Sequence, residues 1–453
     1  MTNPVLDTGF LPAVLWNRAF EKAAAEGSEV VTVGLFCGNK VVAKRTLKVL
    51  PDVDRSFHYL ERMLKAMLWV IGGNRILFAG PDVLFQCLEK HYSGSAIGRF
   101  DSEIIGEKIY DHALRIEKAS ADDIPEPAQE SAALGRHLDG CRIGFDLGGS
   151  DRKCAAVIDG KVVFSEEVKW DPYFEMNPTY HFEGIMDSLK RAAEHLPRVD
   201  AIGGSAAGVY VNNEVRVASL FRGVPADQFK SDVRPIFKKL KATWDDVPFD
   251  IVNDGEVTAL AGSMLLNDAA VLGISMGTSL AAGYVTPEGN ITSWLNELAF
   301  VPVDYRKDGP VDEWSGDAGC GVPFFSQQGV ARLAPLAGIE FPEDTPFSEQ
   351  LSEVQRLMAE GDDRARKIYE TLGLCFGYTI AHYADFYDFR NLLILGRVTS
   401  GEGGQVLIEK AEEVLAAEFS ELSKKVSITT PDEQMKRHGQ AVAAASLPMI
   451  GGK

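Results

Sequence analysis

A pair of glycines between two apolar segments marks the first place where this sequence could do chemistry. The stretch from Asp146 to Lys153 reads DLGGSDRK. Without a Cβ, Gly148 and Gly149 let the backbone turn tightly and approach an anion, so that freed N–H groups can point at phosphate oxygens. Asp146 could hold Mg²⁺ through water, while Ser150 and Lys153 could add a hydroxyl and a positive charge. The alternative is an ordinary β-hairpin in which the glycines only make the turn.

A carboxylate follows a second apolar segment, Phe249–Val252, in the run IVNDGE. We expect a strand there and a helix over Glu256–Leu266. Groups beyond the carboxyl end of a strand face the ligand crevice of open α/β sheets. Asp254 could therefore accept the proton of an attacking hydroxyl, the general-base role in phosphoryl transfer, and Asn253 could hydrogen-bond a polyol. The alternative is helix capping, since Asn and Asp are preferred N-cap residues, and one residue could do both.

Two later glycine-rich turns could contact a nucleotide. Gly277 and Thr278 lie between two apolar segments, where backbone N–H groups could bind outer phosphates. The second turn begins at Gly396 and includes Gly403, after a buried strand and before a helix expected from about Gln405. Such a turn could lie flat against adenine and ribose. The alternatives are a plain hairpin for the first turn and a simple strand-to-helix loop for the second.

Composition and motif searches exclude several classes of protein. With 46 Lys and Arg against 65 Asp and Glu, the net charge of −19 disfavours DNA and anionic membranes as partners. The six scattered cysteines form no C-x-x-C pair and are typical of reduced thiols in a cytoplasmic protein. We expect no signal peptide and no membrane span. No Walker or Rossmann motif occurs, and the G-x-S-x-G match at 273–277 is followed by an apolar strand instead of a nucleophile-elbow helix.

The elements needed to hold these residues follow from the hydrophobic pattern after residue 141. It predicts strands at Arg142–Asp146, Lys153–Ile158, Lys161–Lys169 and Ala201–Gly204, with a helix over His181–His195. Strands at Ala270–Ser275 and Ser279–Val285 repeat the strand–glycine–strand pattern about 130 residues later. Two similar α/β lobes around a cleft are the natural interpretation of such a duplication.

The first 118 residues form a separate α/β block with a core of its own. We expect helices at Leu11–Ala25, Phe57–Ile71 and Val83–His91, a hairpin of Val30–Phe36 with Val41–Leu50, and a strand at Arg75–Ala79. Residues 119–140 contain DDIPEP and little bulky apolar content, which is typical of a linker.

Over roughly residues 142–450, these motifs in this order resemble the ROK family of sugar kinases and repressors, in the actin–hexokinase superfamily. The resemblance implies two ribonuclease-H-like lobes around an ATP cleft, lobe I at 141–254 and lobe II at 255–453, with a C-terminal helix packing back towards lobe I. It implies ATP and Mg²⁺, the latter near Asp146. Its implied site comprises Asp254 as catalytic base, Asp146, Gly148, Gly149, Ser150, Lys153, Gly277, Thr278, Gly396 and Gly403 for ATP, and Gly208, Asn253 and Glu297 for the sugar.

The chain also departs from the ROK pattern. Family members usually carry Gly-His after the glutamate and then a zinc-binding cysteine cluster, but here Leu298-Ala299 follows Glu297 and Cys320 stands alone. We therefore expect no zinc. Arg397 replaces a common second glycine of the adenosine turn. ROK repressors begin with a winged helix, whereas residues 1–140 here hold 16 Lys and Arg against 19 Asp and Glu and no basic recognition helix, so we expect no nucleic-acid partner.

The resulting hypothesis is an ATP-dependent carbohydrate kinase that acts on a small-molecule sugar in the cytoplasm, with a homodimer as a candidate assembly. Two alternatives stay open. One is a non-catalytic sugar sensor or scaffold on the kinase fold, and the other is an ATPase switch. Neither the sugar nor the task of residues 1–118 follows from the sequence.

Overall fold

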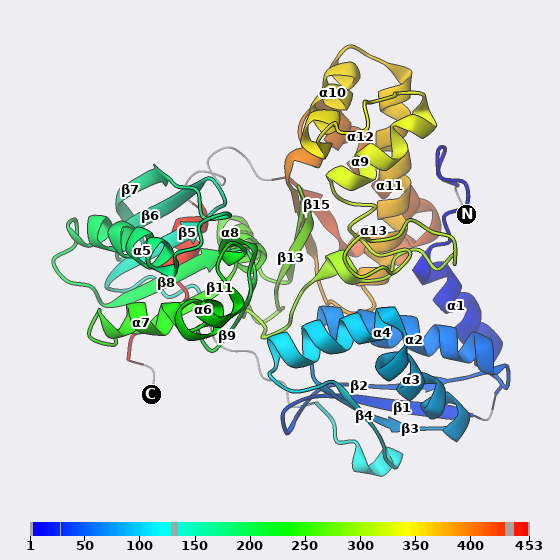
Figure 1. Ribbon diagram of the computed structural model, residues 1–453. Coiled ribbons are helices and arrows are strands. Elements are labelled where there is room, and N and C mark those ends of the chain that lie inside the picture. The colour runs from blue at the N-terminus through cyan, green and yellow to red at the C-terminus, as the bar shows by residue number, and fades with distance from the viewer. Residues whose placement is uncertain (1–2, 28, 128–134, 431–438, 452–453) are drawn as a thin grey trace. The chain divides into compact units, whose positions relative to one another are not determined.

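The computed structural model describes residues 3–27, 29–127, 135–430 and 439–451 of the chain (Figure 1). Contacts divide the chain into two compact units. Unit 1 comprises Met1–Glu130, Ile274–Ala282 and Trp294–Ile428, and unit 2 comprises Ser131–Gly273, Gly283–Ser293 and Thr429–Lys453. These bounds do not test the expected division at residues 118, 140 and 254, which stays a prediction. Part of the expected linker, residues 128–134, lies outside the described residues.

A five-stranded sheet with the order β11-β8-β5-β6-β7 forms the centre of unit 2. Strands β5, β8 and β11 are parallel, while β6 and β7 continue the sheet in antiparallel pairing. The predicted mixed α/β fold class is confirmed. Each predicted strand of this sheet lies within an observed strand or overlaps an observed strand. Their bounds are Cys141–Leu147 (β5), Asp151–Ile158 (β6), Lys161–Lys169 (β7), Ala201–Ala206 (β8) and Phe249–Asn253 (β11).

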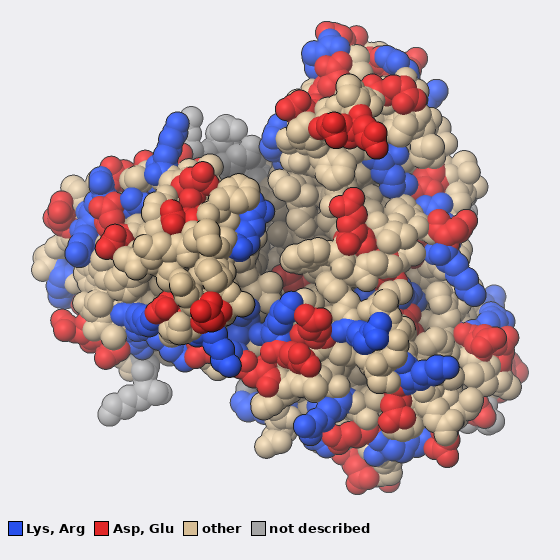
Figure 2. All heavy atoms as spheres, viewed as in Figure 1, with Lys and Arg blue, Asp and Glu red and all other residues tan. Residues whose placement is uncertain are grey.

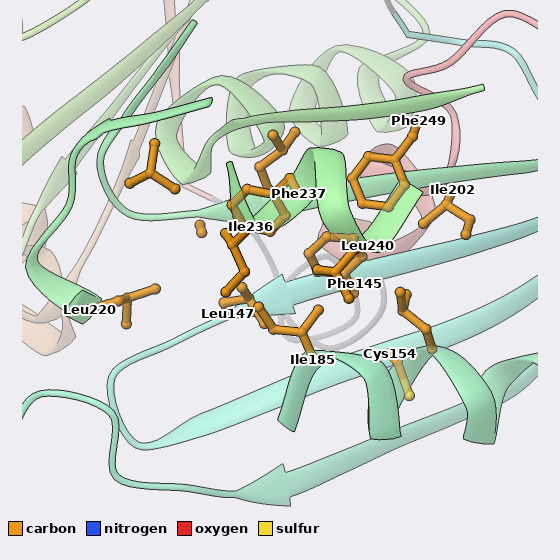
Figure 3. Close-up of a cluster of buried hydrophobic side chains, with 14 of the residues drawn as sticks. Phe145, Leu147, Cys154, Ile185, Ile202, Leu220, Ile236, Phe237, Leu240 and Phe249 are labelled. Atoms are coloured by element: carbon orange, nitrogen blue, oxygen red, sulfur yellow. The ribbon is translucent and has the colours of Figure 1, made fainter. Parts of the chain in front are cut away.

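One hydrophobic core joins this sheet to helices α5 (Pro178–Ala193) and α7 (Ile236–Ala242). The ring centroids of Phe145 and Phe249, from neighbouring parts of the sheet, are 6.0 Å apart, and Phe237 of α7 lies 6.2 Å from Phe145. Figure 3 shows these aromatic side chains together with Ile185 of α5 in the same cluster. Burial of so much apolar surface makes the sheet a rigid support for loops at its edges.

Helix α14 (Gln440–Ala445) packs directly on β5 and β8 because two strand positions are glycine. A Cβ at Gly144 would collide with the carbonyl oxygen of Ala441, and one at Gly203 would collide with that of Ala444. The fully buried Arg142 also donates to the carbonyl oxygen of Pro448 at 2.6 Å, just beyond the end of this helix. The C-terminal helix is thereby fixed to the two central parallel strands.

The first part of unit 1 is a four-stranded sheet, β2-β1-β3-β4, with helices α2 to α4 along one side of it (Figure 1). All six predicted elements of this block are confirmed, while β4 and α4 were not expected. The elements are α1 (Ala13–Ala24), β1 (Val30–Cys37), β2 (Lys40–Lys48), α2 (Val53–Val70), β3 (Arg75–Ala79), α3 (Asp82–Gly94), α4 (Ala96–Asp101), the π-helical turn Ser102–Ile109 and β4 (Arg115–Lys118).

The rest of unit 1 is largely helical. Long helices α11 and α12 pack closely because Gly373 and Gly377 of α11 meet the backbone of α12 without a side chain between them. A sheet with the order β13-β12-β14-β15 lies in this half of the sequence. The elements that lie wholly in unit 1 are α9 (Gln327–Leu333), α10 (Phe347–Ala359), α11 (Asp363–Tyr383), β14 (Asn391–Leu395), α12 (Gly401–Glu418) and α13 (Ser420–Lys425). The strands β12 (Val271–Met276), β13 (Leu280–Val285) and β15 (Ser427–Thr429) lie only partly in unit 1.

Helix α2 carries ionised side chains into the interior of unit 1. Lys65 is fully buried, and its ammonium lies 3.0 Å from a carboxylate oxygen of Asp101 and 3.1 Å from one of Asp317. The neighbouring Arg62 donates to both carboxylate oxygens of Asp317, at 3.0 and 3.1 Å, and contacts Glu61. Because buried charges are tolerated only when they are paired, this network ties residues 1–101 to the distant Asp317.

The surface is charged in a mixed pattern. Figure 2 shows Lys and Arg interspersed with Asp and Glu over the visible face, despite the net charge of −19. Among the described residues, every helix is too short or too polar to traverse a bilayer.

The contact between α14 and the glycine strands generates a stability prediction. Gly144→Ala should lower the free energy of unfolding by about 2 kcal/mol or more, because the added methyl group overpacks against a backbone that cannot turn aside. Gly94→Ala, at the end of α3 where a Cβ meets open space, is the matched control and should change stability by less than about 1 kcal/mol. Thermal and urea unfolding would measure both. Equal stability of the two variants would contradict the proposed packing.

Candidate functional site

The register of the parallel strands gathers the predicted residues of unit 2 at one edge of the sheet. β5 pairs with β8 so that Asp146 stands opposite Ser205, and β8 pairs with β11 so that Ala206 stands opposite Asn253. Neighbouring strands are about 4.8 Å apart. Asp146 and the Asn253-Asp254 pair therefore lie at the same carboxyl edge, with one strand between them.

Asn253 is a helix cap as well as an edge residue. It precedes α8 (Asp254–Leu266), and its side-chain oxygen accepts a hydrogen bond from the Gly255 amide at 2.7 Å. Its side-chain nitrogen donates to the carbonyl oxygen of Gly208 at 2.8 Å. Gly208 has φ +132°, in the region that favours glycine, so the loop after β8 turns sharply beside the cap. The capping alternative is thus correct for Asn253, and its contact with a sugar stays a prediction.

Asp254 is the half-buried carboxyl of this edge, and its surroundings disfavour the charged form. Burial raises its pKa, the negative charge of Asp146 raises it further, and together they bring it to about 6. Burial also raises the pKa of Asp146, although the Ser205 hydroxyl and Lys153 oppose that shift. A carboxyl with a pKa near 6 can exchange a proton at neutral pH, as a general base must.

The two edge carboxyls fit the Mg²⁺ that the resemblance implies. Mg²⁺ prefers oxygen ligands, retains several waters and is commonly bound by one or two carboxylates plus substrate phosphates. Asp146 and Asp254 repel one another, and a nearby cation would relieve that repulsion. Within the described ranges no group of three or more His, Cys, Asp or Glu could hold a metal ion. The expected absence of zinc stays a prediction.

The glycine hairpin after β5 is shaped by a tryptophan. The indole N–H of Trp170 donates to the carbonyl oxygen of Gly148 at 2.7 Å, and its backbone N–H donates to that of Ser150 at 3.1 Å. The Gly148 amide is bonded to Asp151 at 2.9 Å. Within the part of the chain that the structure describes, the amides of Gly149 and Ser150 have no acceptor, so both are free to bind an anion.

The side chains of this hairpin are less available than its backbone. The hydroxyl of Ser150 donates to Asp151 at 2.9 Å, and the ammonium of Lys153 lies 3.6 Å from the same carboxylate. A Cβ at Gly149 would overlap the ring and hydroxyl of Tyr173, so any other residue here would require Tyr173 to move. A phosphate bound here would compete with Asp151 for Ser150 and Lys153, whereas it would find the amides free.

The predicted residues of unit 1 include two turns that lie side by side. The Gly277 amide donates to the carbonyl oxygen of Ser279 at 2.9 Å, which leaves Thr278 exposed at the tip. Gly396 has φ +105°, and a Cβ there would overlap the backbone of Met276. The end of β14 is therefore in contact with the end of β12, and the Gly277 and Gly396 turns are brought together.

A cavity of about 240 Å³ lies at the start of α12. It is lined by Gln355, Ala359, Ser400, Gly401, Glu402 and Gly403. Gly403 lines this cavity, and its contact with a nucleotide stays a prediction. The expected helix start at about Gln405 is wrong, since α12 begins at Gly401. The backbone carbonyl of Arg397 accepts a hydrogen bond from the Gln355 side chain at 2.6 Å, which ties the turn that begins at Gly396 to α10.

Glu297 is held by a different part of unit 1 from the glycine turns. Its side chain is half-buried, and its backbone amide donates to the carbonyl oxygen of Trp69 in helix α2 at 3.0 Å. The preceding residue, Asn296, has a left-handed backbone with φ +54°. Such a conformation is uncommon outside glycine and is enriched at binding and catalytic sites.

Sequence reasoning missed Trp170, Gln355 and Trp69. Trp170 directly follows β7, and a tryptophan at a strand end next to a Gly-Gly hairpin is a signal that could have indicated it. Gln355 lies in an ordinary amphipathic helix, and Trp69 lies in an apolar helix end, so neither has a local signal of function.

Comparisons with known proteins identify the fold. No family model matches the sequence, and no curated protein is significantly similar to it. A ROK hexokinase from Thermus thermophilus has a TM-score of 0.54 at 17% identity, covering 68% of this chain and 97% of its own. A ROK glucokinase from Streptomyces griseus, solved with glucose and AMPPNP, has a TM-score of 0.51 at 20% identity, covering 68% and 99%.

A ROK transcriptional regulator, a homologue of the E. coli MLC protein, is also similar, with a TM-score of 0.50 at 17% identity over 72% of this chain and 82% of its own. The same fold thus serves kinases and a regulator. Together with the strand register and the glycine turns, these likenesses show that the chain has the actin/hexokinase-like fold of the ROK proteins.

Proposed function

We propose that the protein transfers the γ-phosphoryl group of ATP to a hydroxyl of a sugar or sugar derivative. The observation that carries the proposal is the raised pKa of Asp254 at a sheet edge shared with Asp146 and with two unoccupied hairpin amides. A phosphate-binding element and a carboxyl tuned to accept a proton are the parts that phosphoryl transfer to an alcohol requires.

In this mechanism the sugar hydroxyl hydrogen-bonds to Asp254, which accepts its proton as the oxygen attacks the γ-phosphorus. The bond between that phosphorus and the β,γ-bridging oxygen breaks, so the products are a sugar phosphate and ADP. The amides of Gly149 and Ser150 stabilise phosphate charge, and Asn253, Gly208 and Glu297 orient the sugar. Mg²⁺ near Asp146, when bound, would neutralise phosphate charge. The turns at Gly277, Thr278, Gly396 and Gly403 complete the proposed ATP site.

The similarity to a transcriptional regulator supports a second candidate function, a sugar sensor without catalytic activity. The raised pKa of Asp254 favours the kinase, because a protein that only binds sugar needs no group tuned to accept a proton. ADP release measured with ATP, Mg²⁺ and a panel of glucose, mannose, fructose and N-acetylglucosamine separates the candidates. Sugar-dependent release supports the kinase, release without sugar indicates an ATPase switch, and sugar binding without release indicates a sensor.

Asp254→Asn should abolish most turnover and stabilise the fold at the same time. Loss of the base lowers kcat by about 10²- to 10⁴-fold. A carboxyl whose pKa is raised by folding favours the native state only while protonated, so its contribution is lost as the pH rises through about 6. Asparagine removes that charge, and the variant should gain about 3 kcal/mol of stability at pH 8. Activity assays and thermal unfolding measure the two effects.

The control for this variant is Asp250→Asn, which neutralises an aspartate near the start of β11, at the end of that strand away from Asp254 of α8. It should keep kcat within about threefold. Near-normal turnover in Asp254→Asn, or an equal loss in both variants, would contradict the assignment of the base.

The pH dependence should report the same carboxyl. Because the reaction needs Asp254 ionised, kcat/KM should fall about tenfold per pH unit below pH 6 and level off above it. The profile is measured with saturating ATP between pH 4.5 and 8, with fold checked by circular dichroism. An acid limb centred near pH 4, the ordinary range of an aspartate, would show that Asp254 is not the titrating base.

A further inference from the structure

The end of helix α2 is completed by the chain that carries Glu297. The last carbonyl groups of a helix lack partners within the helix and must be satisfied from elsewhere. Here the carbonyl oxygen of Trp69 accepts the Glu297 amide and that of Val70 accepts the Asn296 amide, each at 3.0 Å. The backbone at the predicted sugar-binding glutamate is therefore fixed by the N-terminal block.

The conformation that these bonds hold is an unusual one. Asn296 is 2% exposed and has φ +54°, and its side-chain oxygen accepts a hydrogen bond from the Tyr387 hydroxyl at 3.1 Å. A buried residue stays in the left-handed region only when its surroundings impose it. The hydrogen bonds to α2 supply part of that constraint. They therefore help to set the direction in which the Glu297 side chain extends from the backbone.

The Trp69 side chain has contacts through both its ring and its indole N–H. Its ring packs on Phe300 with centroids 4.2 Å apart, three residues after Glu297. Its indole N–H donates to Asp101 at 2.9 Å, and Asp101 is paired with the buried Lys65 one helical turn earlier on α2. The end of α2 is thus in contact with the Lys65–Asp101 ion pair and with the segment that carries Glu297.

The residues that follow Glu297 are also connected to α2, through the part of the chain after Asp317. Val322 donates its backbone N–H to Ala299 at 3.0 Å, which places the segment after Asp317 against the residues that follow Glu297. Asp317 pairs with Arg62 and Lys65 of α2. Burial alone would raise the pKa of Asp317, but these two cations outweigh it and lower the pKa, so the carboxylate stays ionised. The chain that carries Glu297 and the chain after Asp317 are therefore both bonded to α2.

From this geometry we propose that α2, through Trp69, is a positioning element for Glu297, which makes residues 1–118 part of the sugar site. The inference rests on the proposed function, in which Glu297 binds the sugar. It assigns the N-terminal block a task in substrate recognition. It also distinguishes this block from the ATP-binding elements, whose residues have no part in these contacts.

Two glycines of the N-terminal block provide a matched test. Gly72, just after α2, has φ +91°, and a Cβ there would overlap the Tyr110 hydroxyl and lie 3.0 Å from Leu295 Cγ, two residues before Glu297. Gly38, in the turn between β1 and β2, has φ +60° and a Cβ there would meet open space. Alanine strains the backbone at both positions, but only Gly72→Ala pushes on the Glu297 segment.

We expect Gly72→Ala to raise KM for the best sugar of the panel by about tenfold or more, because small misplacements of binding groups have large effects. KM for ATP should stay within about twofold, and Gly38→Ala should leave both constants within that range. Glu297→Gln shows the effect of losing the carboxylate itself. Hydrogen exchange at the Asn296 and Glu297 amides should be faster in Gly72→Ala than in wild type and unchanged in Gly38→Ala.

Trp69→Phe is the second variant, in case Gly72→Ala does not fold. It retains a ring against Phe300 but loses the bond to Asp101, and the sugar KM should rise by about threefold without a change in the KM for ATP. An active wild-type protein whose sugar KM is the same in Gly38→Ala, Gly72→Ala and Trp69→Phe would overturn the positioning role alone. A wild-type protein that phosphorylates no sugar would overturn the proposed function and this inference with it.

Discussion

Parallel pairing of β5, β8 and β11 determines which residues reach the carboxyl edge of the unit 2 sheet. Side chains alternate between the two faces of a strand, so a slip of one residue would exchange every inward and outward position. Burial of the β5 and β11 faces against α5, α7 and α14 excludes such a slip. The positions of the loops at Gly148, Gly208 and Asn253 are fixed because the register of the strands before them is fixed.

A conflict between stability and chemistry follows from that alignment. Asp146 and Asp254 are brought to one edge, where burial disfavours the charged form of both and the charge of Asp146 further disfavours that of Asp254. The hydrophobic core beneath the sheet offsets this unfavourable electrostatic energy. The observed arrangement is the kind expected when a site has a task besides holding the fold together.

Much of the fold could be predicted because hydrophobic periodicity is a local property. The strands β5, β6, β7 and β11 and the helix α2 were recognisable from their apolar residues, and the glycine turns were recognisable from composition. The start of α12 could not be located, since the glycines of its first turn have low helix propensity, yet tertiary contacts hold them in the helix. The burial of Arg62 and Lys65 in the interior also could not be predicted from the sequence. In the sequence of an amphipathic helix, such residues look like part of the solvent-exposed face. Their partner Asp317 comes close to them only when the chain is folded.

The buried charges of α2 also set an order in which the chain can be assembled. Arg62 and Asp317 are separated by 255 residues of sequence. At about 5–20 residues per second, a ribosome needs roughly 13–50 s to make the segment between them. During that interval Arg62 and Lys65 lack one of their counter-ions and favour contact with water over burial. The first elements of the protein to be synthesised are therefore among the last whose packing can be completed.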